Sequence, residues 1–589
     1  MVKRIFLGAV LVGSALCVAS VSWADSTQAL HTLISEYWQN RLQENPLSAT
    51  YAGVNTYNDK LQDITPEGYA RRTEKAERYL ARLQDIDRGS LTAADQLNAL
   101  LLEQILSDAV DLAPFETWRM PFTADSGFHI QMNFVAGATR FRKAQDYEDY
   151  LARLRAIPAQ FAQHIENMQA GLKVGFSQPQ EILEFVLPSF AAQVVEPATA
   201  HPLYRPFKNM ISTLSEADQA RLQAEAKKVM EQEVIPAFAT LSAFMHKEYL
   251  PAARKSVGAL DMPNGEAYYQ QRVRYYTTLP DVDADDIHQL GLEEVARIRS
   301  EMADIIASLE WNDSFDAFVE HLRTDPKFYA KSPQQLIQRA SYLSKQVDGR
   351  LPRLFHTLPR QPYSVEPVPA DIAPNYTTGR YVGAPLGADR GGQYWVNTYA
   401  LDKRPLYSLA ALTLHESVPG HHLQIALNKE ITGVPEFRRA YSPTAYVEGW
   451  GLYAEKLGIE LDIYETPYDH FGRLSYEIWR ACRLVIDTGL HAKGWSRQQA
   501  IDYLASNTAL SLHNVRMEVD RYISWPGQAL AYKMGELTLL DLRRKATEQL
   551  GPAFDIRDFH EVILLEGAVP LNVLIERVDG YIAAKSVSN

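Results

Sequence analysis

Histidine and glutamate are concentrated in one short segment of the chain, from His415 to His422. The segment reads His-Glu-Ser-Val-Pro-Gly-His-His, in a chain that has only 15 histidines. Neutral imidazoles bind zinc, and a neighbouring carboxylate can take a proton from a water molecule that the metal activates. The segment therefore predicts a zinc centre in which His415 is a ligand and Glu416 is the general base. The alternative is that these histidines only cap or pack against the end of a helix.

The spacing of the histidines differs from the His-Glu-x-x-His motif, which places two ligands four residues apart on one helix face. In a continuous helix, His421 would point about 240° away from His415 and lie ~9 Å farther along the axis. Pro419 interrupts helical hydrogen bonding, and Gly420 adopts backbone angles that other residues avoid. We therefore expect a bulge that brings His421 back beside His415. His422 is the alternative second ligand, or it could face substrate.

A third protein ligand is expected from another element, because catalytic zinc usually has three protein ligands and one open position. The segment 442–455 contains the best candidate. Ser442 as N-cap and Pro443 at the first helical position form a helix start, and Glu448 and Glu455 then share one helix face. We expect Glu448 to be the third ligand and Glu455 to orient a ligand through a hydrogen bond.

Gly449 and Gly451 leave little side-chain bulk around Glu448. Each glycine weakens a helix by about 1 kcal/mol, so the pair predicts a close contact with another helix or a requirement of the site. The alternative for Glu448 is a solvated acidic face. The aromatic residues around it argue against full exposure.

Polar residues that could contact a substrate lie in two later segments. One contains Arg480, Arg483 and His491, and His491 is a candidate catalytic residue. The other segment, residues 518–535, contains a tyrosine that could stabilise an oxyanion and hydrogen-bond donors that could bind a substrate carboxylate. Buried Arg–Asp pairing between helices is the alternative role for these groups. The substrate-binding candidates in these segments and near the metal motif are His422, Arg521, Gln528, Tyr532 and Lys533.

Most of the chain has helical periodicity. Apolar residues recur at three- and four-residue steps from Leu151 to Leu172 and from Ile287 to Ile305. Pro158 should kink or split the first helix, and Asp285 or Asp286 could cap the second.

One region, between Leu358 and Arg404, breaks the helical pattern with six prolines and several glycines. Such a composition predicts loops and short strands. Residues 392–398 look like a strand, and we expect an extended substrate to pair with its edge, the alternative being a structural hairpin. Asn397 in this strand is a further substrate-binding candidate.

The composition, 46% hydrophobic and 22% charged, is that of a globular protein. Residues 1–24 have the pattern of a signal peptide, with Lys3 and Arg4 before an apolar run and a small-residue cleavage site at Ala24. A retained membrane anchor is the alternative, and the poor lipobox before Cys17 makes a lipoprotein the weaker interpretation. We expect a periplasmic or secreted protein that does not bind a membrane once the signal is removed.

Removing residues 1–24 takes away two positive charges and no negative ones, so the net charge moves from −13 to −15. Such an acidic protein is not expected to bind nucleic acid or anionic membranes. Only Cys482 of the two cysteines then remains, which rules out an intrachain disulfide. The oligomeric state is left open.

At these motifs the chain resembles a bacterial family known as domain of unknown function 885. That family is similar to helical Glu-zincin peptidases such as thimet oligopeptidase and angiotensin-converting enzyme. The resemblance implies a mostly helical, two-lobed fold around a deep channel. With the strand expected at residues 392–398, the predicted fold is mainly α with a small β element before the metal-binding helix. The matching segments are 415–422, 446–455, 487–491 and 521–533, with weaker similarity at 277–278 and 287–295.

The resemblance also implies a catalytic role for Tyr522. The run from Arg521 to Ser524 is similar to a stretch of angiotensin-converting enzyme whose tyrosine stabilises the transition state. The Pro-Gly insertion between the histidines is the departure from the pattern, and it leaves His421 and His422 open as second ligand.

The sequence as a whole predicts a secreted peptidase that uses one Zn²⁺ ion to hydrolyse short peptides. Residues 25–270 would form an N-terminal helical region and residues 271–589 a catalytic helical region of the same body. Carboxypeptidase, dipeptidyl-carboxypeptidase and endopeptidase action all remain open, as does the use of cobalt or manganese. The rivals are a zinc hydrolase of non-peptide amides or esters and a non-catalytic helical binding protein with a structural metal.

Overall fold

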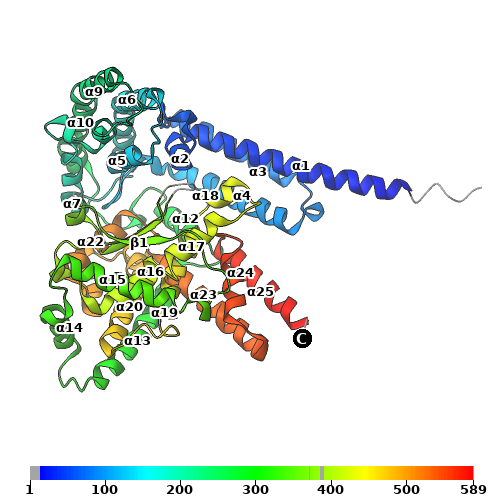
Figure 1. The fold of residues 1–589 in the computed structure, drawn as a ribbon, viewed down its shortest axis with the longest axis vertical. Coiled ribbons are helices and arrows are strands. Elements are labelled where there is room, and N and C mark those ends of the chain that lie inside the picture. Colours follow the sequence, from blue (N-terminus) through cyan, green and yellow to red (C-terminus); the bar gives the residue numbers. More distant parts are fainter. Residues whose placement is uncertain (1–12, 371, 385–389, 588–589) are drawn as a thin grey trace, which may run out of the picture.

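The computed structural model describes residues 13–370, 372–384 and 390–587, and it is mainly helical with one small sheet (Figure 1). This confirms the expected fold class. The predicted signal peptide, residues 1–24, lies in part outside these ranges, and its described part continues into α1 (Gly13–Glu44). Within these ranges, none of the helices has both the length and the apolar character needed to cross a bilayer.

Eleven helices precede residue 260 in the described chain, and many of them are capped as the sequence allows. Thr65, Thr92 and Ser215, for example, each accept a hydrogen bond from a backbone N–H of the first turn of the helix that follows. The helices are α1, α2 (Pro46–Tyr51), α3 (Pro66–Gln84), α4 (Ala93–Leu112), α5 (Phe128–Ala138), α6 (Ala144–Val174), α7 (Gln180–Ala191), α8 (Arg205–Lys208), α9 (Glu216–Val229), α10 (Ile235–Phe244) and α11 (Leu250–Ala252).

The remaining α-helices of the described chain lie after residue 264. Helix α13 packs along α20, and α19 packs along α23. The helices are α12 (Gly265–Thr277), α13 (Ala284–Ser308), α14 (Phe315–Thr324), α15 (Pro333–Asp348), α16 (Leu409–Glu416), α17 (His421–Glu430), α18 (Glu436–Ala440), α19 (Thr444–Leu457), α20 (Pro467–Ala492), α21 (Arg497–Asn507), α22 (Leu512–Ser524), α23 (Leu530–Leu550), α24 (Ile556–Leu564) and α25 (Leu571–Val587).

The buried apolar side chains of the described chain form more than one core. Apolar side chains from Phe122 to Ala253 form a core of their own, and Figure 1 shows α5, α6, α9 and α10 gathered at one end of the molecule. Side chains from Leu30 to Leu106, on α1, α3 and α4, instead share one core with residues 276–582. Helices α1, α3 and α4 therefore share a core with the helices that carry the His415 segment.

Two helix starts lie one to three residues from their predicted positions. The N-cap of α13 is Asp283, whose carboxylate accepts hydrogen bonds from the N–H groups of Asp285 and Asp286, the two residues expected to cap it. The N-cap of α19 is Pro443, so Ser442 precedes the cap. Local sequence locates a helix start better than it fixes the capping residue, because neighbouring polar residues compete for the same N–H groups.

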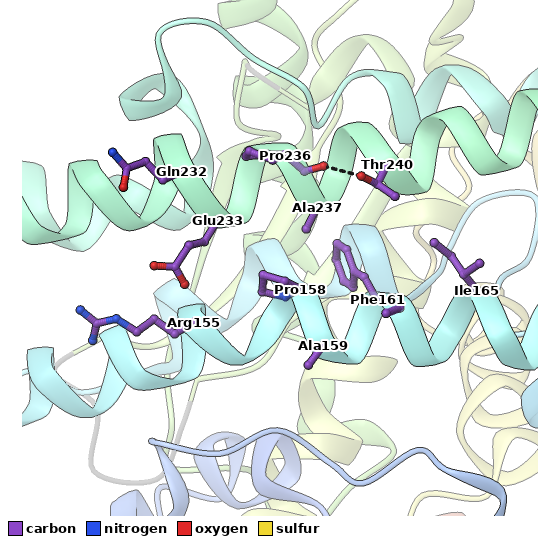
Figure 2. A pocket seen from close by; sticks show the side chains of 11 residues that line it. Arg155, Pro158, Ala159, Phe161, Ile165, Gln232, Glu233, Pro236, Ala237 and Thr240 are labelled. Atoms are coloured by element: carbon purple, nitrogen blue, oxygen red, sulfur yellow. Dashed lines mark hydrogen bonds between the residues drawn. The ribbon is translucent and has the colours of Figure 1, made fainter.

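Helix α6 runs through Pro158 without the predicted split. Figure 2 shows Pro158 and Phe161 on α6 facing Pro236 and Ala237 on α10 across an open groove of about 530 Å³. No residue of the His415 segment lines this groove. The deep channel implied by the resemblance therefore stays a prediction.

The sheet has three short strands: β1 (Tyr363–Pro367), β2 (Gly379–Val382) and β3 (Gly392–Val396). Strand β3 is central, parallel to β1 and antiparallel to β2. The predicted strand at 392–398 is therefore present, but its backbone is paired on both sides and has no edge for a substrate. In this respect the prediction was wrong, and β2 is an edge strand next to it.

Candidate metal centre

The backbone between α16 and α17 leaves the helical conformation, as the Pro-Gly pair predicts. Ser417 and Gly420 have ψ angles of −113° and −130°, and the Val418–Pro419 peptide bond is cis. A Cβ atom on Gly420 would lie 1.9 Å from the carbonyl oxygen of His415, so only glycine fits at this position. The ring centroids of His415 and His421 are consequently 4.6 Å apart.

Three side chains converge at this break, two from the helix pair and Glu448 from α19. Oε2 of Glu448 lies 3.5 Å from Nε2 of His415 and 3.6 Å from Nε2 of His421. All three candidate ligand atoms lie within 4.8 Å of one another. Two ligand atoms bound to one tetrahedral zinc ion at about 2.0–2.1 Å are roughly 3.3 Å apart. The donor set and its spacing therefore fit a single divalent ion.

His422 points away from this group. Its Nδ1 lies 3.0 Å from the hydroxyl of Tyr381, and its ring packs 4.4 Å from that of Tyr363. It is 1% exposed, and burial lowers its pKa to about 4. The structure therefore brings His421, and not His422, to His415. His422 is buried, and its expected role in binding substrate stays a prediction.

Glu455 makes the contact that an orienting carboxylate would make. Its Oε1 accepts a hydrogen bond from Nδ1 of His415 at 2.8 Å, which leaves Nε2 facing the centre. Arg480 lies 3.5 Å from the same oxygen. On the other side of the imidazole, a Cβ on Gly451 would lie 2.6 Å from the ring, so the glycine is needed for the helix to pass this close.

The centre stabilises positive charge. Burial opposes protonation of His415, but hydrogen bonds to Glu448 and Glu455 and the charge of Glu416 outweigh it and raise its pKa to about 10. Burial likewise opposes ionisation of Glu448, yet its contacts with the two histidines hold its pKa well below the usual range. Carboxylates that hold a proton on a buried imidazole in this way would equally favour a divalent cation.

We expect zinc binding at pH 7 to release a proton from His415. Below its ordinary pKa of 6.5, protonated His415 contributes fully to the stability of the metal-free fold, and this contribution is lost as the pH rises through about 10. Zinc binds only the neutral ring, so proton and metal compete and zinc affinity rises with pH. Calorimetry in two buffers of different ionisation enthalpy counts the protons. An affinity that stays constant between about pH 6 and about pH 9 would contradict this expectation.

Glu416 ends α16 beside the ligands and is held by the edge strand. Its Oε2 accepts a hydrogen bond from the backbone N–H of Tyr381 at 2.7 Å. The side chain is largely buried. The orientation of the candidate general base is therefore fixed by strand β2 and not by its own helix.

Gly449 explains how α19 approaches α23. A Cβ at this position would lie 2.5 Å from the backbone of Gly535. We expect Gly449→Ala to lower the free energy of unfolding by about 1–3 kcal/mol, because the two helices would have to separate. Gly137→Ala in α5 is the matched control, since a Cβ there meets nothing within 4 Å. Urea unfolding in which both variants behave alike would disprove the close-contact explanation.

Tyr522, the expected transition-state residue, is 1% exposed. Its hydroxyl accepts hydrogen bonds from Nε1 of Trp479 and Nε of Arg483, each at 3.0 Å. Arg483 also pairs with Glu518 at 3.1 Å. The hydroxyl is thus part of a buried hydrogen-bond network, and the catalytic role that the resemblance implies for Tyr522 stays a prediction.

Three further candidate residues have internal roles in the structure. His491 is buried, accepts a hydrogen bond from the N–H of Ala259, and donates one to the carbonyl of Tyr522; burial lowers its pKa to about 3. Lys533 is 0% exposed and pairs with the carboxylates of three glutamates. The amide of buried Asn397 donates to three carbonyls of the loop before β2. These contacts are internal to the protein, and the roles expected for the three residues in catalysis or substrate binding stay predictions.

The structure does bring Arg521, Gln528 and Tyr532 together. One Nη atom of Arg521 donates to Oε1 of Gln528 at 2.6 Å and to the hydroxyl of Tyr532 at 3.3 Å. Their role in binding substrate stays a prediction.

Strand β2 supplies residues that the sequence did not single out. Tyr381 fixes Glu416 through its backbone N–H, which no residue-type pattern can indicate. The exposed Arg380 interacts electrostatically with both Glu416 and Glu448. The sequence contains one weak indication of these residues: they lie in the irregular, proline-rich region that precedes α16.

Comparison with known proteins gives a family and a fold, without an activity. The model of the family described as "Bacterial protein of unknown function (DUF885)" matches residues 46–578. A crystal structure of "the putative lipoprotein from Colwellia psychrerythraea" is 28% identical, covers 95% of this chain and 100% of its own, and has a TM-score of 0.89. "A putative lipoprotein of unknown function from Shewanella oneidensis" is 19% identical, covers 93% and 99%, and has a TM-score of 0.71. No curated protein matches.

Proposed function

The chain belongs to the DUF885 family, and from its metal centre we propose that it is a zinc-dependent peptidase acting on short peptides. One observation carries the proposal: His415, His421 and Glu448 converge on one point, with the carboxylate of Glu416 beside them. Three ligands with one open position are typical of catalytic zinc, whereas structural zinc is usually closed by four.

When bound, zinc would supply Lewis-acid chemistry at the scissile carbonyl and lower the pKa of the attacking water. The protein's own residues do the rest. Glu416 takes a proton from that water and passes it to the leaving amine. The N–H of Tyr381 holds one carboxylate oxygen at 2.7 Å, and we assign proton transfer to the other oxygen. Glu455 keeps the Nε2 atom of His415 directed at the centre.

The free edge of β2 supports a peptide substrate. The N–H of Asn397 donates to the carbonyl of Thr378, and the same register makes Arg380 and Trp395 a hydrogen-bonded pair. In an antiparallel pair the residues between such positions point their backbone groups outward. The backbone of Gly379 and Tyr381 is therefore directed away from β3, and that of Tyr381 reaches Glu416. An extended peptide could pair with this edge beside the general base.

Two rival functions remain to be separated. A zinc hydrolase of small amides or esters would need no strand edge, so β2 favours peptides. A binding protein with a structural metal would need no carboxylate fixed beside the ligands, so Glu416 favours catalysis. For location, the lipoprotein names of both structural neighbours support a place outside the cytoplasm, and we propose the periplasm.

Metal analysis combined with a peptide-library digest tests the proposal. We expect one zinc ion per chain and hydrolysis of short unstructured peptides that a chelator stops and zinc restores. A panel of small amides and esters runs in parallel. Zinc-loaded protein that cleaves this panel but no peptide would refute the peptidase assignment.

A further inference from the structure

The outer face of the sheet carries a cation beside the metal centre. Side chains alternate along a strand, so Tyr381 points inward to His422 while Arg380 points outward. Arg380 shares this outer face with Trp395, its cross-strand partner, and Tyr376 packs against Trp395 at 6.1 Å between ring centroids. Arg380 is exposed, and the two aromatic rings are half-buried.

Arg380 directly precedes Tyr381, whose backbone N–H holds the carboxylate of Glu416, so its guanidinium is near the candidate general base. It makes a hydrogen bond with the hydroxyl of Tyr376 and interacts with the carboxylates of Glu416 and Glu448. Desolvation lowers its pKa, but these three partners outweigh that effect and raise it. The charges of Glu416 and Glu448 would together balance a divalent ion, so Arg380 would add a positive charge beside the loaded centre.

Other arginines near the centre are already paired with buried carboxylates. Arg480 lies 3.5 Å from Glu455, and Arg483 lies 3.1 Å from Glu518. Both arginines are buried. Arg380 differs from them because it is exposed and stands on the strand edge that a substrate would approach.

We propose that Arg380, oriented by Tyr376, binds a carboxylate of the substrate close to the scissile bond. The inference rests on the proposed function. A guanidinium binds a carboxylate through two parallel hydrogen bonds, which gives both affinity and orientation. Arg380 adjoins the residue that holds the general base, and each extended residue spans about 3.3–3.6 Å, so the carboxylate lies within one or two residues of the cleaved bond. It is either the terminal α-carboxylate or an acidic side chain.

Binding is measured in zinc-loaded protein carrying Glu416→Gln, so that no turnover occurs. The glutamine oxygen can still accept the hydrogen bond from Tyr381. Fluorescence polarisation compares an N-terminally labelled short peptide with its C-terminal amide, and with a version whose acidic side chains are changed to amides. Arg380→Ala, Arg380→Lys and Tyr376→Phe are added one at a time, with Arg353→Ala, an exposed arginine paired with Asp462, as control.

Arg380→Ala should weaken binding of the carboxylate peptide about 10- to 100-fold and leave the carboxylate-free peptide unchanged. Arg380→Lys should recover part of the loss, Tyr376→Phe should cost less, and Arg353→Ala should cost nothing. The carboxylate bound by Arg380 is the one whose conversion to an amide makes the peptide's affinity insensitive to Arg380→Ala. An equal loss for peptides with and without a carboxylate would overturn the inference.

Wild-type kinetics separate this inference from the proposed function. If wild-type protein hydrolyses no peptide, the peptidase assignment fails, while the binding comparison still decides the role of Arg380. If it hydrolyses free and amidated peptides equally and Arg380→Ala changes neither rate nor KM, the assignment stands and the role of Arg380 is refuted.

Discussion

Replacing Glu416 with glutamine is expected to lower kcat about 10²- to 10⁴-fold, the range that general base catalysis contributes. Glutamine has nearly the same shape but cannot take a proton from water. Its side-chain oxygen can still accept the hydrogen bond that the N–H of Tyr381 donates to Oε2 of Glu416. The loss should therefore appear in kcat, with zinc content and thermal stability close to those of the wild type.

Glu430→Gln is a matched control for this substitution. Glu430 ends α17 and accepts hydrogen bonds from the segment at Arg360, so the same chemical change is made on the neighbouring helix. Its kcat should stay within a few-fold of the wild-type value. The mechanism is refuted if the Glu416 variant keeps its zinc and hydrolyses peptides at the wild-type rate.

Replacing His421 with alanine is expected to remove zinc, whereas the same change at His422 is not. Loss of an outer hydrogen-bond partner typically costs 10- to 100-fold in metal affinity, so loss of a direct ligand should cost more than about 100-fold. His421 lies 3.6 Å from Glu448, but His422 contacts Tyr381 and Tyr363. Metal analysis after dialysis against a weak chelator measures the difference.

The two variants control for each other, because both remove an imidazole from the first turn of α17. His422→Ala also loses buried packing, so its melting temperature should fall while its zinc content remains near one per chain. If His422→Ala lost zinc and His421→Ala retained it, the assignment of His421 as a ligand would be wrong.

The arrangement of the metal segment follows from local chemistry. A proline without an N–H and a glycine with a carbonyl oxygen 1.9 Å from its missing Cβ leave few backbone paths between His415 and His421. Helical periodicity likewise predicts α13 almost to its ends. Gly449 indicates that the helix carrying Glu448 packs closely against another helix, because a glycine would only destabilise an isolated helix.

The rest depends on partners distant in sequence. Nothing in residues 392–396 says that the strand is central, because strand order is set by which segments return beside it. The polar run from 521 to 533 reads equally well as a substrate site or as a buried network, and the structure buries Tyr522 and Lys533. The sequence could not single out Arg380, because its position beside Glu416 follows from the register of β2 and belongs to no motif.

The shared core has a consequence for when the protein can finish folding. Helices from the first hundred residues and from the last thirty close around the same apolar interior that supports the metal helices. During synthesis, which starts at the amino end, the chain cannot complete this core until its C-terminal helices have been released. If the protein is a zinc peptidase that reaches the periplasm unfolded, as we propose for its function and location, it would take up its ion there from the supply of that compartment.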